Sequence, residues 1–515
     1  MSHRSRREFL ANVGRGMLVA SVGPAVALDM GFTPILADDG KDVLNFGDLE
    51  PLVALMQDTP ADKLLPLLVE RVKNGTDLRT LTAAGALANA RTFGGEDYIG
   101  YHTFMALSPA YEMSRELPAA LKPLPVLKVL HRNATRMQAN GGRKNEVLHE
   151  IEPATDLPKN RDGGEVLQEL VRNRDTVGAE RAFAAMAKGP IGEAYQHLQF
   201  EVQDEVDVHR IVLSWRAWMS IDLVGAQHAH TLLRQSVRYC VYQEKRIHEQ
   251  KGAPSAVRAL LPKLFDQYKL LSKSFGTREA DDAWLDKFSQ IIYGPSREKA
   301  AEAVAGALAE GFSPETIGEA LSIAANRLVL HDPGRRQAWP DKPIGSVHGD
   351  SVGVHASDSA NAWRNIARVS NPRNTAASLI VGAFHTAGQS GGQNKLPYPD
   401  PEQLSAVTER DQAKLLDELD AAVRAKDQFR ACAVTARYAE TGAEVRPVFD
   451  RLIQFATSED GALHAEKYYR TVSEEFSKTR PAFRWGHVVA LARVTASEYG
   501  KTAPGYSQGK ELLKV

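Results

Sequence analysis

The chain has 515 residues, of which 43% are hydrophobic, and its 63 Lys and Arg residues balance 64 Asp and Glu residues to a net charge of −1. A chain of this length can bury a large core, and the balanced charge gives no indication that nucleic acid or an anionic membrane surface is a partner. The only cysteines are Cys240 and Cys432, which excludes a disulfide framework and leaves open whether the two pair or stay as buried free thiols.

The N-terminal segment has the pattern of an export signal. Arg6 and Arg7 stand before Phe9-Leu10 and before a mildly apolar stretch, 13–28, that contains no acidic residue. An arginine pair ahead of an apolar stretch diluted with glycine is typical of the twin-arginine class of bacterial signals, which serves proteins that fold before export, often around a metal or cofactor. The alternative is a short N-terminal helix in which the arginine pair occurs by chance.

From this pattern we expect 1–37 to be a twin-arginine signal peptide and leader, and 38–515 to be the exported, periplasmic protein. The partner of the first segment is the twin-arginine export machinery. Two cleavage positions satisfy the preference for small residues, one after Ala27 and one after Ala37, and the sequence does not choose between them. No later apolar run reaches about eighteen residues, so we expect no membrane span in the mature chain.

The rest of the chain has helical periodicity. Apolar residues recur every three to four positions in 64–72 and again in 300–308. A polar residue followed by proline marks helix starts at Thr59, Ser313 and Asp400. No series of alternating β-branched residues predicts a sheet, so the fold class we expect is all-α, as a single large helical domain.

Three long loops are predicted where Pro, Gly, Asn and Asp cluster, at 152–164, 332–350 and 388–399. Loops of this length inside a compact domain are often functional. The second loop ends in His348-Gly349-Asp350-Ser351, which indicates either a tight loop over a metal or a helix entry capped by Asp350; we expect the cap.

Two helix-pair segments resemble each other and indicate an internal repeat. Asp62-Lys63 and Glu298-Lys299 stand at the same distance before Gly75 and Gly311, and each glycine is followed by a second Ala-rich helix. Weaker echoes occur at 165–186 and 411–438. The sequence therefore predicts about four helix-pair repeats around a central site, unless the likeness reflects only a shared Ala-rich composition.

Each predicted pair precedes an apolar or aromatic residue that is followed at once by histidine. The four phrases are Tyr101-His102, Val208-His209, Val354-His355 and Leu463-His464. Histidines delivered by repeated units can converge on one axis, as ligands do in helical bundles, and imidazole suits iron, copper, zinc and nickel. We expect these four histidines to bind one metal ion, with the imidazoles of His102, His355 and His464 within roughly 5 Å of one another.

Lys467 follows His464 by one helical turn, so the two side chains project from nearly the same face. Burial lowers the pKa of a lysine, and a neutral amine can take up carbon dioxide to become a carbamate, which is an anionic oxygen ligand. The alternative is an exposed lysine on a solvated helix face.

Several of these phrases resemble the questin oxidase-like family, whose members are helical oxygenases that cleave aromatic polyketide rings. The resemblance lies in 101–107, in 355–364 and above all in 462–467, which reads Ala-Leu-His-Ala-Glu-Lys. It implies a mononuclear non-haem iron held by His102, His209, His355 and His464, with a carbamylated Lys467 as the fifth ligand. The phrase around His209 matches the family poorly, and His197, His228 and His230 lie nearby as alternatives.

The resemblance and the export signal together predict an exported metal-dependent oxidoreductase, a non-haem iron oxygenase that acts on an aromatic or phenolic small molecule with dioxygen. Iron is the metal we expect, with another divalent metal as the alternative. The other functions left open are a non-catalytic helical-repeat binding protein and a metal-assisted hydrolase. Phosphate-loop, GxSxG, HExxH and CxxC motifs are absent, which leaves nucleotide-binding, serine-hydrolase, zincin and zinc-finger functions without support.

Overall fold

The computed structural model describes residues 43–515 except 273, 339–341, 348, 350 and 462–463. Within these residues the regular structure is helical, apart from two isolated β-bridges, and no strand forms. The prediction of an all-α fold is therefore confirmed. The signal and leader predicted for 1–37 lie outside the described residues.

Twenty of the helices fall into four units of five consecutive helices each. The first unit is α3 (Glu50–Asp58), α4 (Ala61–Lys73), α5 (Leu78–Phe93), α6 (Tyr98–Glu116) and α7 (Pro123–Ala139). The second is α8 (Gly163–Arg172), α9 (Thr176–Met186), α10 (Ile191–Val202), α11 (Val208–Val224) and α12 (Ala229–Glu249). The third is α14 (Asp282–Tyr293), α15 (Arg297–Ala309), α16 (Pro314–Leu330), α17 (Val352–Val369) and α18 (Pro372–Thr386). The fourth is α20 (Gln412–Arg424), α21 (Gln428–Glu440), α22 (Arg446–Ser458), α23 (Ala465–Lys478) and α24 (Pro481–Glu498).

Shorter or linking elements complete the described chain. They are the α-helices α13 (Val257–Tyr268), α19 (Pro401–Ser405) and α25 (Pro504–Leu513), and the 3-10 turns η1 (Gly47–Leu49), η2 (Gly142–Asn145) and η3 (Ala226–His228).

The four units share one packing pattern. In each, the first helix contacts the third and fifth, the second contacts the fifth, and the fourth packs between the third and the fifth. Between units, the third helix of each contacts the fifth helix of the next, and the third helix of the last unit, α22, contacts α7 of the first. The four units therefore close into a ring with approximate fourfold symmetry.

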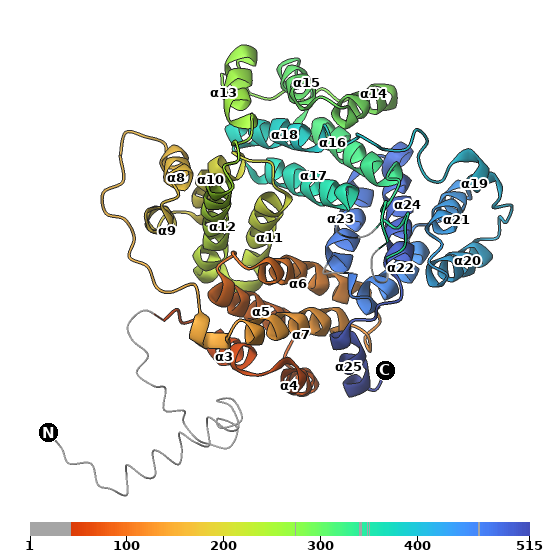
Figure 1. Ribbon diagram of the computed structural model, residues 1–515, viewed down its shortest axis with the longest axis horizontal. Coiled ribbons are helices and arrows are strands. Elements are labelled where there is room, and N and C mark those ends of the chain that lie inside the picture. Colours follow the sequence, from red (N-terminus) through yellow and green to blue (C-terminus); the bar gives the residue numbers. More distant parts are fainter. Residues whose placement is uncertain (1–42, 273, 339–341, 348, 350, 462–463) are drawn as a thin grey trace, which may run out of the picture.

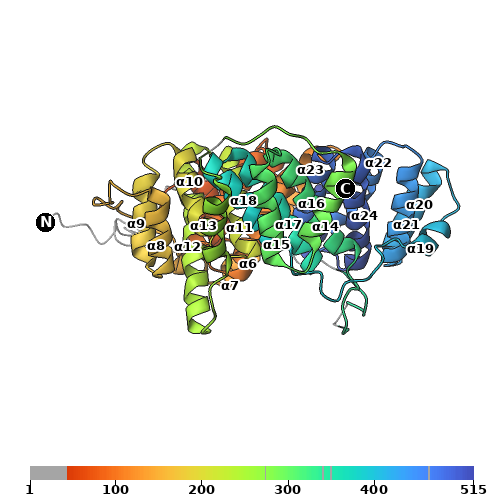
Figure 2. The same cartoon turned by 90° about the horizontal axis from the view of Figure 1, so that it is seen from above.

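The fourth helices of the units form the inner wall of this ring. α6 contacts α11, α11 contacts α17, α17 contacts α23, and α23 returns to α6. Figure 1 shows these four helices around the centre, with the remaining helices outside them. Figure 2, from the side, shows a flattened molecule. Each inner helix carries one of the four candidate histidines in its first turns or at its N-cap, so the symmetry of the fold brings the histidines to one place.

The sequence repeat is confirmed for its stronger pair and corrected for its weaker echoes. α4–α5 and α15–α16, which carry the matching phrases, occupy the same second and third positions of their units. The echoes at 165–186 and 411–438 correspond to α8–α9 and α20–α21, the first and second positions. Amphipathic helices of similar composition look alike at any position, whereas the packing pattern distinguishes them.

The composition of α5 follows from its position. Every residue from Leu81 to Phe93 is buried, because α3, α6, α7, α11 and α12 all pack against this helix. A helix that is covered on all sides is not amphipathic: α5 is rich in small apolar residues that let its neighbours approach closely, and its buried Asn89 and Arg91 are hydrogen-bonded. A Cβ added at Gly85 would lie 2.3 Å from a Leu130 methyl carbon, so alanine there would require the Leu130 side chain to move.

Several local expectations can be compared directly with the structure. Ser313 and Asp400 cap α16 and α19 as expected, but Pro60 rather than Thr59 is the N-cap of α4. α17 is capped by the hydroxyl of Ser351 rather than by Asp350, which together with His348 lies outside the described residues. Cys240 and Cys432 are separate buried thiols. Among the described helices, none combines the length and apolar character that a membrane crossing requires.

Candidate metal centre

The four candidate ligands sit at equivalent places on the inner helices. His102 lies in the second turn of α6, His209 and His355 lie in the first turns of α11 and α17, and His464 is the N-cap residue of α23. Side chains on a helix lean towards its N-terminus, so the four imidazoles lie at the N-terminal ends of their helices. Local helix geometry and the ring closure together create the cluster.

The distances show that the imidazoles converge. His102, His209 and His355 each offer one nitrogen within 4.8 Å of the others. His355 Nε2 and His464 Nε2 are 3.1 Å apart, and the ring centroids of His102 and His464 are separated by 5.3 Å. The structure thus brings all four histidines together at about the separation that the sequence analysis expects.

Two imidazole nitrogens in this cluster are buried without a hydrogen-bond partner in the described part of the chain. These are His102 Nε2 and His209 Nε2. His102 Nδ1 is 2.7 Å from the carbonyl oxygen of Tyr98, which can only accept, so Nδ1 carries the proton and the Nε2 lone pair faces the cluster. A buried nitrogen left unpaired costs about 1–3 kcal/mol. A metal ion would satisfy both nitrogens, and a ligating histidine commonly donates its other N–H to a carbonyl in this way.

Burial keeps these imidazoles neutral. It lowers the pKa of His102 and His464 well below the ordinary value for histidine and that of His355 to about 3, and the nearby Lys467 ammonium adds to the effect in all three. At neutral pH these three side chains therefore carry lone pairs rather than charges, as metal ligands must.

Lys467 is buried, with 2% of its surface exposed, so the interpretation of an exposed lysine on a solvated helix face is wrong. Burial lowers the pKa of its ammonium to about 8, the Asp358 carboxylate opposes this shift, and the Arg216 guanidinium reinforces it. A substantial fraction of neutral amine is therefore present at neutral to slightly alkaline pH.

Three residues near the cluster were not anticipated from the sequence. Asp358 follows His355 by one turn, as Lys467 follows His464, and accepts a hydrogen bond of 2.8 Å from the Thr471 hydroxyl. Arg216 lies two turns after His209 and is fully buried beside Asp358. Asp207 is the N-cap of α11, 3.6 Å from His209 Nδ1. Their spacing from the histidines could have indicated that they lie near the site. Only the ring closure, however, places their helices side by side.

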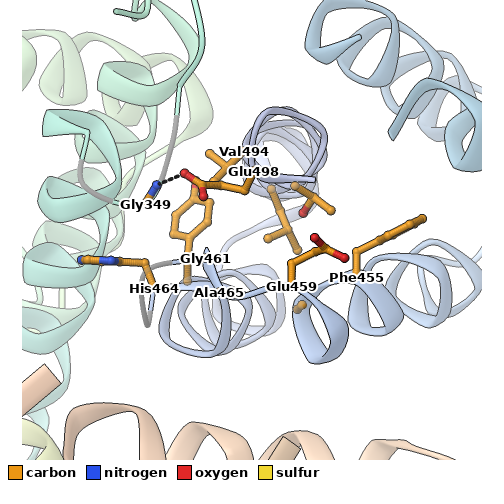
Figure 3. A pocket seen from close by; sticks show the side chains of 12 residues that line it. Gly349, Phe455, Glu459, Gly461, His464, Ala465, Val494 and Glu498 are labelled. Carbon is orange, nitrogen blue, oxygen red and sulfur yellow. Dashed lines mark hydrogen bonds between the residues drawn. The ribbon is translucent and has the colours of Figure 1, made fainter. Parts of the chain in front are cut away.

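The predicted loop at 332–350 reaches the cluster at Gly349. Its N–H donates to Glu498 Oε1 at 3.0 Å, and a Cβ at this position would lie 2.3 Å from the Cβ of His464. Figure 3 shows Gly349 next to His464. Only glycine allows the loop backbone to come this close, and the contact holds the backbone at His464 in place.

A small cavity lies behind His464, between α22, α23 and α24. Its volume is about 30 Å³, and mainly apolar side chains such as Phe455 and Val494 line it. In Figure 3 the imidazole of His464 points away from this cavity. The space suffices for one or two water-sized molecules but not for an organic substrate, which needs several hundred Å³.

The alternative histidines do not join the cluster. His230 stacks on Phe183 with 5.8 Å between ring centroids, and His228 lies edge-on to Phe46. His197 pairs with Asp162 at 3.5 Å. His209 is therefore the histidine of the second unit that reaches the site.

No family model, no curated protein and no solved structure matches the chain. The class of protein is therefore defined by its own geometry: a closed ring of four five-helix units with four histidines converging at the ends of its inner helices.

Proposed function

We propose that this protein is an exported, metal-dependent oxidoreductase whose metal is held by His102, His209, His355 and His464. The observation that carries the proposal is the pair of buried Nε2 atoms, on His102 and His209, which have no hydrogen-bond partner in the described residues. His230 Nε2 is also unpartnered, but it lies outside the cluster, whereas nitrogens of His102, His209 and His355 converge within 4.8 Å of one another. Packing alone would not select such a convergence, since hydrophobic residues would fill the same space at lower cost.

The donor set favours a transition metal. Neutral imidazoles suit iron, copper, zinc and nickel and disfavour calcium and magnesium, which prefer oxygen. We select iron on the resemblance of the histidine phrases to the questin oxidase-like family. Bound iron with an open position would supply dioxygen activation and oxidation of the organic substrate.

The chain's own residues are suited to an anionic partner of that metal. The N-terminal ends of α11, α17 and α23 carry partial positive charge close to the histidines, and Arg216 adds a buried guanidinium nearby. The Asp207 and Asp358 carboxylates offset part of this positive charge, and an anionic oxygen ligand would offset more of it once a cation is bound. A phenolic substrate bound as phenolate would be stabilised in this field, while the choice of an aromatic or phenolic class rests on the resemblance of the histidine phrases.

Lys467 can supply an anionic ligand from within the chain. In its neutral form the amine adds to carbon dioxide, forming an N–C bond and releasing one proton, and the product carbamate carries two oxygen donors. The reduced pKa of Lys467 and its burial beside Arg216 both favour this product over the ammonium. We therefore propose a carbamylated Lys467 as the fifth ligand.

A metal-assisted hydrolase is the second candidate function, because a carbamylated lysine also supports metals that activate water. A non-catalytic exported binding protein is the third, in which the histidines would have a structural role. The identity of the bound metal separates the three candidates. Iron corresponds to the oxidoreductase, zinc to the hydrolase and no metal to the binding protein.

The test is the metal content of protein purified from the periplasm of its native host, measured by mass spectrometry of the intact holoprotein and of an acid digest. We expect about one iron per chain and consumption of dioxygen when phenolic compounds are added. One zinc per chain without oxygen consumption would replace the oxygenase with the hydrolase, and the absence of any stoichiometric metal would overturn the proposal.

A further inference from the structure

Asp207 has two roles in the structure that can be separated. The first is to cap α11, where its Oδ1 accepts the backbone N–H groups of His209 at 2.7 Å and Arg210 at 2.9 Å. Such a cap stabilises a helix by about 1 kcal/mol, and serine or asparagine would serve equally well. Capping alone therefore does not require a carboxylate at this half-buried position.

The second role concerns the imidazole of His209. The same Oδ1 lies 3.6 Å from His209 Nδ1, on the side of the ring away from the unpartnered Nε2. An ionised carboxylate can only accept hydrogen bonds, so it favours the form of the imidazole with the proton on Nδ1. In that form the Nε2 lone pair is available to the ion that the four histidines would share.

A tyrosine from the neighbouring helix fixes the carboxylate in turn. Tyr239 of α12 donates its hydroxyl proton to Asp207 Oδ1 at 3.1 Å, and the side-chain amide of Gln243 donates to the Tyr239 oxygen at 2.7 Å. Because an ionised carboxylate can only accept, the Tyr239 hydroxyl proton is directed to Asp207, and the hydroxyl oxygen stays available to accept from Gln243. A series of polar contacts thus runs from Gln243 through Tyr239 and Asp207 to His209 at the candidate metal centre.

In the sequence, the other units have no carboxylate at the position of Asp207. The residue two positions before the histidine is Gly100 in the first unit, Gly353 in the third and Ala462 in the fourth, and the His102 Nδ1 proton goes to a backbone carbonyl instead. The carboxylate is therefore a specific addition to the second unit, and it places a negative charge beside an otherwise neutral set of imidazoles.

We propose that Asp207 is a positioning residue that holds His209 in its Nδ1–H tautomer and turns the Nε2 lone pair towards the metal. The effect of Asp207 on metal binding rests on the proposed function. Its effect on the His209 tautomer does not, since the tautomer is a property of the metal-free protein. Carboxylate partners of this kind fix the orientation of a ligating histidine and increase its basicity, and their loss weakens metal binding by roughly 10–100-fold.

The experiment compares Asp207→Ser with Asp281→Ser in the full chain. Asp281 caps α14 through the N–H of Trp284 and lies outside the histidine cluster, so its variant controls for the exchange of one capping residue for another. The first readout is the ¹⁵N chemical shifts of His209 in the metal-free protein, which distinguish Nδ1–H from Nε2–H. The second is the affinity for cobalt(II), measured by competition with a chromogenic chelator.

We expect His209 of the wild type to be the Nδ1–H tautomer and Asp207→Ser to shift it towards Nε2–H. The same variant should bind cobalt(II) roughly 10–100-fold more weakly, with a changed visible spectrum, while Asp281→Ser matches the wild type. Asp207→Asn retains an oxygen that can accept the Nδ1 proton, so it should restore most of the tautomer and part of the affinity. Tyr239→Phe should have a smaller effect in the same direction as Asp207→Ser.

The two readouts separate failure of this inference from failure of the proposed function. An unchanged tautomer in Asp207→Ser, or a wild-type His209 with its proton on Nε2, would overturn the positioning role even if the metal binds. A tautomer that shifts in a protein without measurable metal affinity would uphold the positioning role and overturn the metal centre. Equal cobalt(II) affinity in all variants would show that the orientation of His209 does not matter for binding and would also overturn the inference.

Discussion

The Nε2 atoms of His355 and His464 lie 3.1 Å apart, although the two residues are separated by 109 positions in the chain. Two nitrogens bound to one ion at about 2.0–2.1 Å, with angles between octahedral and tetrahedral, would be separated by roughly 2.9–3.4 Å. The observed separation therefore suits a shared ion. It also suits a hydrogen bond between two neutral imidazoles, one of which donates, so binding measurements must decide between the two.

Replacing His355 by asparagine should remove one ligand and weaken metal binding by more than about 100-fold. Loss of a residue that only orients a ligand weakens binding by roughly 10–100-fold. The measurement is the dissociation constant for cobalt(II) or iron(II). His230→Asn is a matched control, because half-buried His230 also has a buried, unpartnered Nε2 but lies outside the cluster. Equal weakening in both variants would point to general destabilisation and contradict the ligand role of His355.

Lys467 requires a replacement that conserves volume, because alanine at this buried position would leave a cavity. Lys467→Met should keep the helix content of the wild type and lose both metal affinity and the carbamate. Carbamylation can be followed by ¹³C NMR after equilibration with labelled bicarbonate, with a signal expected only when Lys467 is present. A wild type without a carbamate signal, or a methionine variant with full metal content, would discard Lys467 as a ligand.

Gly349→Ala should disturb the site without removing a ligand. The new Cβ would meet the Cβ of His464 at 2.3 Å, so the loop or the histidine must move, at a cost of about 1–3 kcal/mol in unfolding free energy and with weaker metal binding. The comparison is Gly192→Ala in α10, where no atom lies within 4 Å of the added Cβ and alanine favours the helix. In Gly192→Ala the unfolding free energy, measured with urea, should stay the same or increase, and the metal affinity should not decrease. An unaffected Gly349→Ala would show that the loop adapts freely.

The metal-free protein should lose stability as the pH falls below about 6.5. The folded-state pKa values of His102, His355 and His464 are lowered, to about 3 for His355, while the unfolded chain binds protons near 6.5. In this window the unfolded state binds more protons, so each such histidine reduces the unfolding free energy by up to about 1.4 kcal/mol per pH unit. Three further histidines affect stability in the same direction, because their pKa values are lowered to about 4: His230, His385 and His487.

The measurement is urea unfolding of metal-free protein between pH 7.5 and 5. His230→Asn should make the dependence shallower by about one proton, whereas an added metal ion should make it steeper, because protons and metal compete for the same nitrogens. A stability that is flat with pH across this range would contradict the neutral, buried state of these imidazoles.

Export remains a prediction from the sequence. Replacing Arg6 and Arg7 by lysine should leave folded protein in the cytoplasm, because the twin-arginine route recognises the arginine pair, whereas the general secretory route needs only positive charge and an apolar run. Cell fractionation and immunoblotting give the distribution. Normal periplasmic delivery of the lysine variant would remove the twin-arginine assignment and leave the metal centre unaffected.

Much of the site could be predicted from the sequence because local patterns specify it. The placement of each histidine after an apolar or aromatic residue at the start of a helix is a local feature, and the likeness between the segments that form α4–α5 and α15–α16 indicates equivalent units. The interpretation of Lys467 as an exposed residue failed because its helix is covered by α6 and α17, which come from distant parts of the chain.

By itself, the sequence determined that the chain is helical, that similar helix pairs recur and that histidines mark the starts of certain helices, because periodicity, caps and phrases depend on neighbouring residues. Only the tertiary structure decided that the units contain five helices and close into a ring, and that α6, α11, α17 and α23 form its inner wall. Ring closure depends on how side chains on separate helices interlock, and amphipathic helices of similar composition do not specify their partners. The same packing decided that Arg216 of α11 and Asp358 of α17 lie near Lys467 of α23.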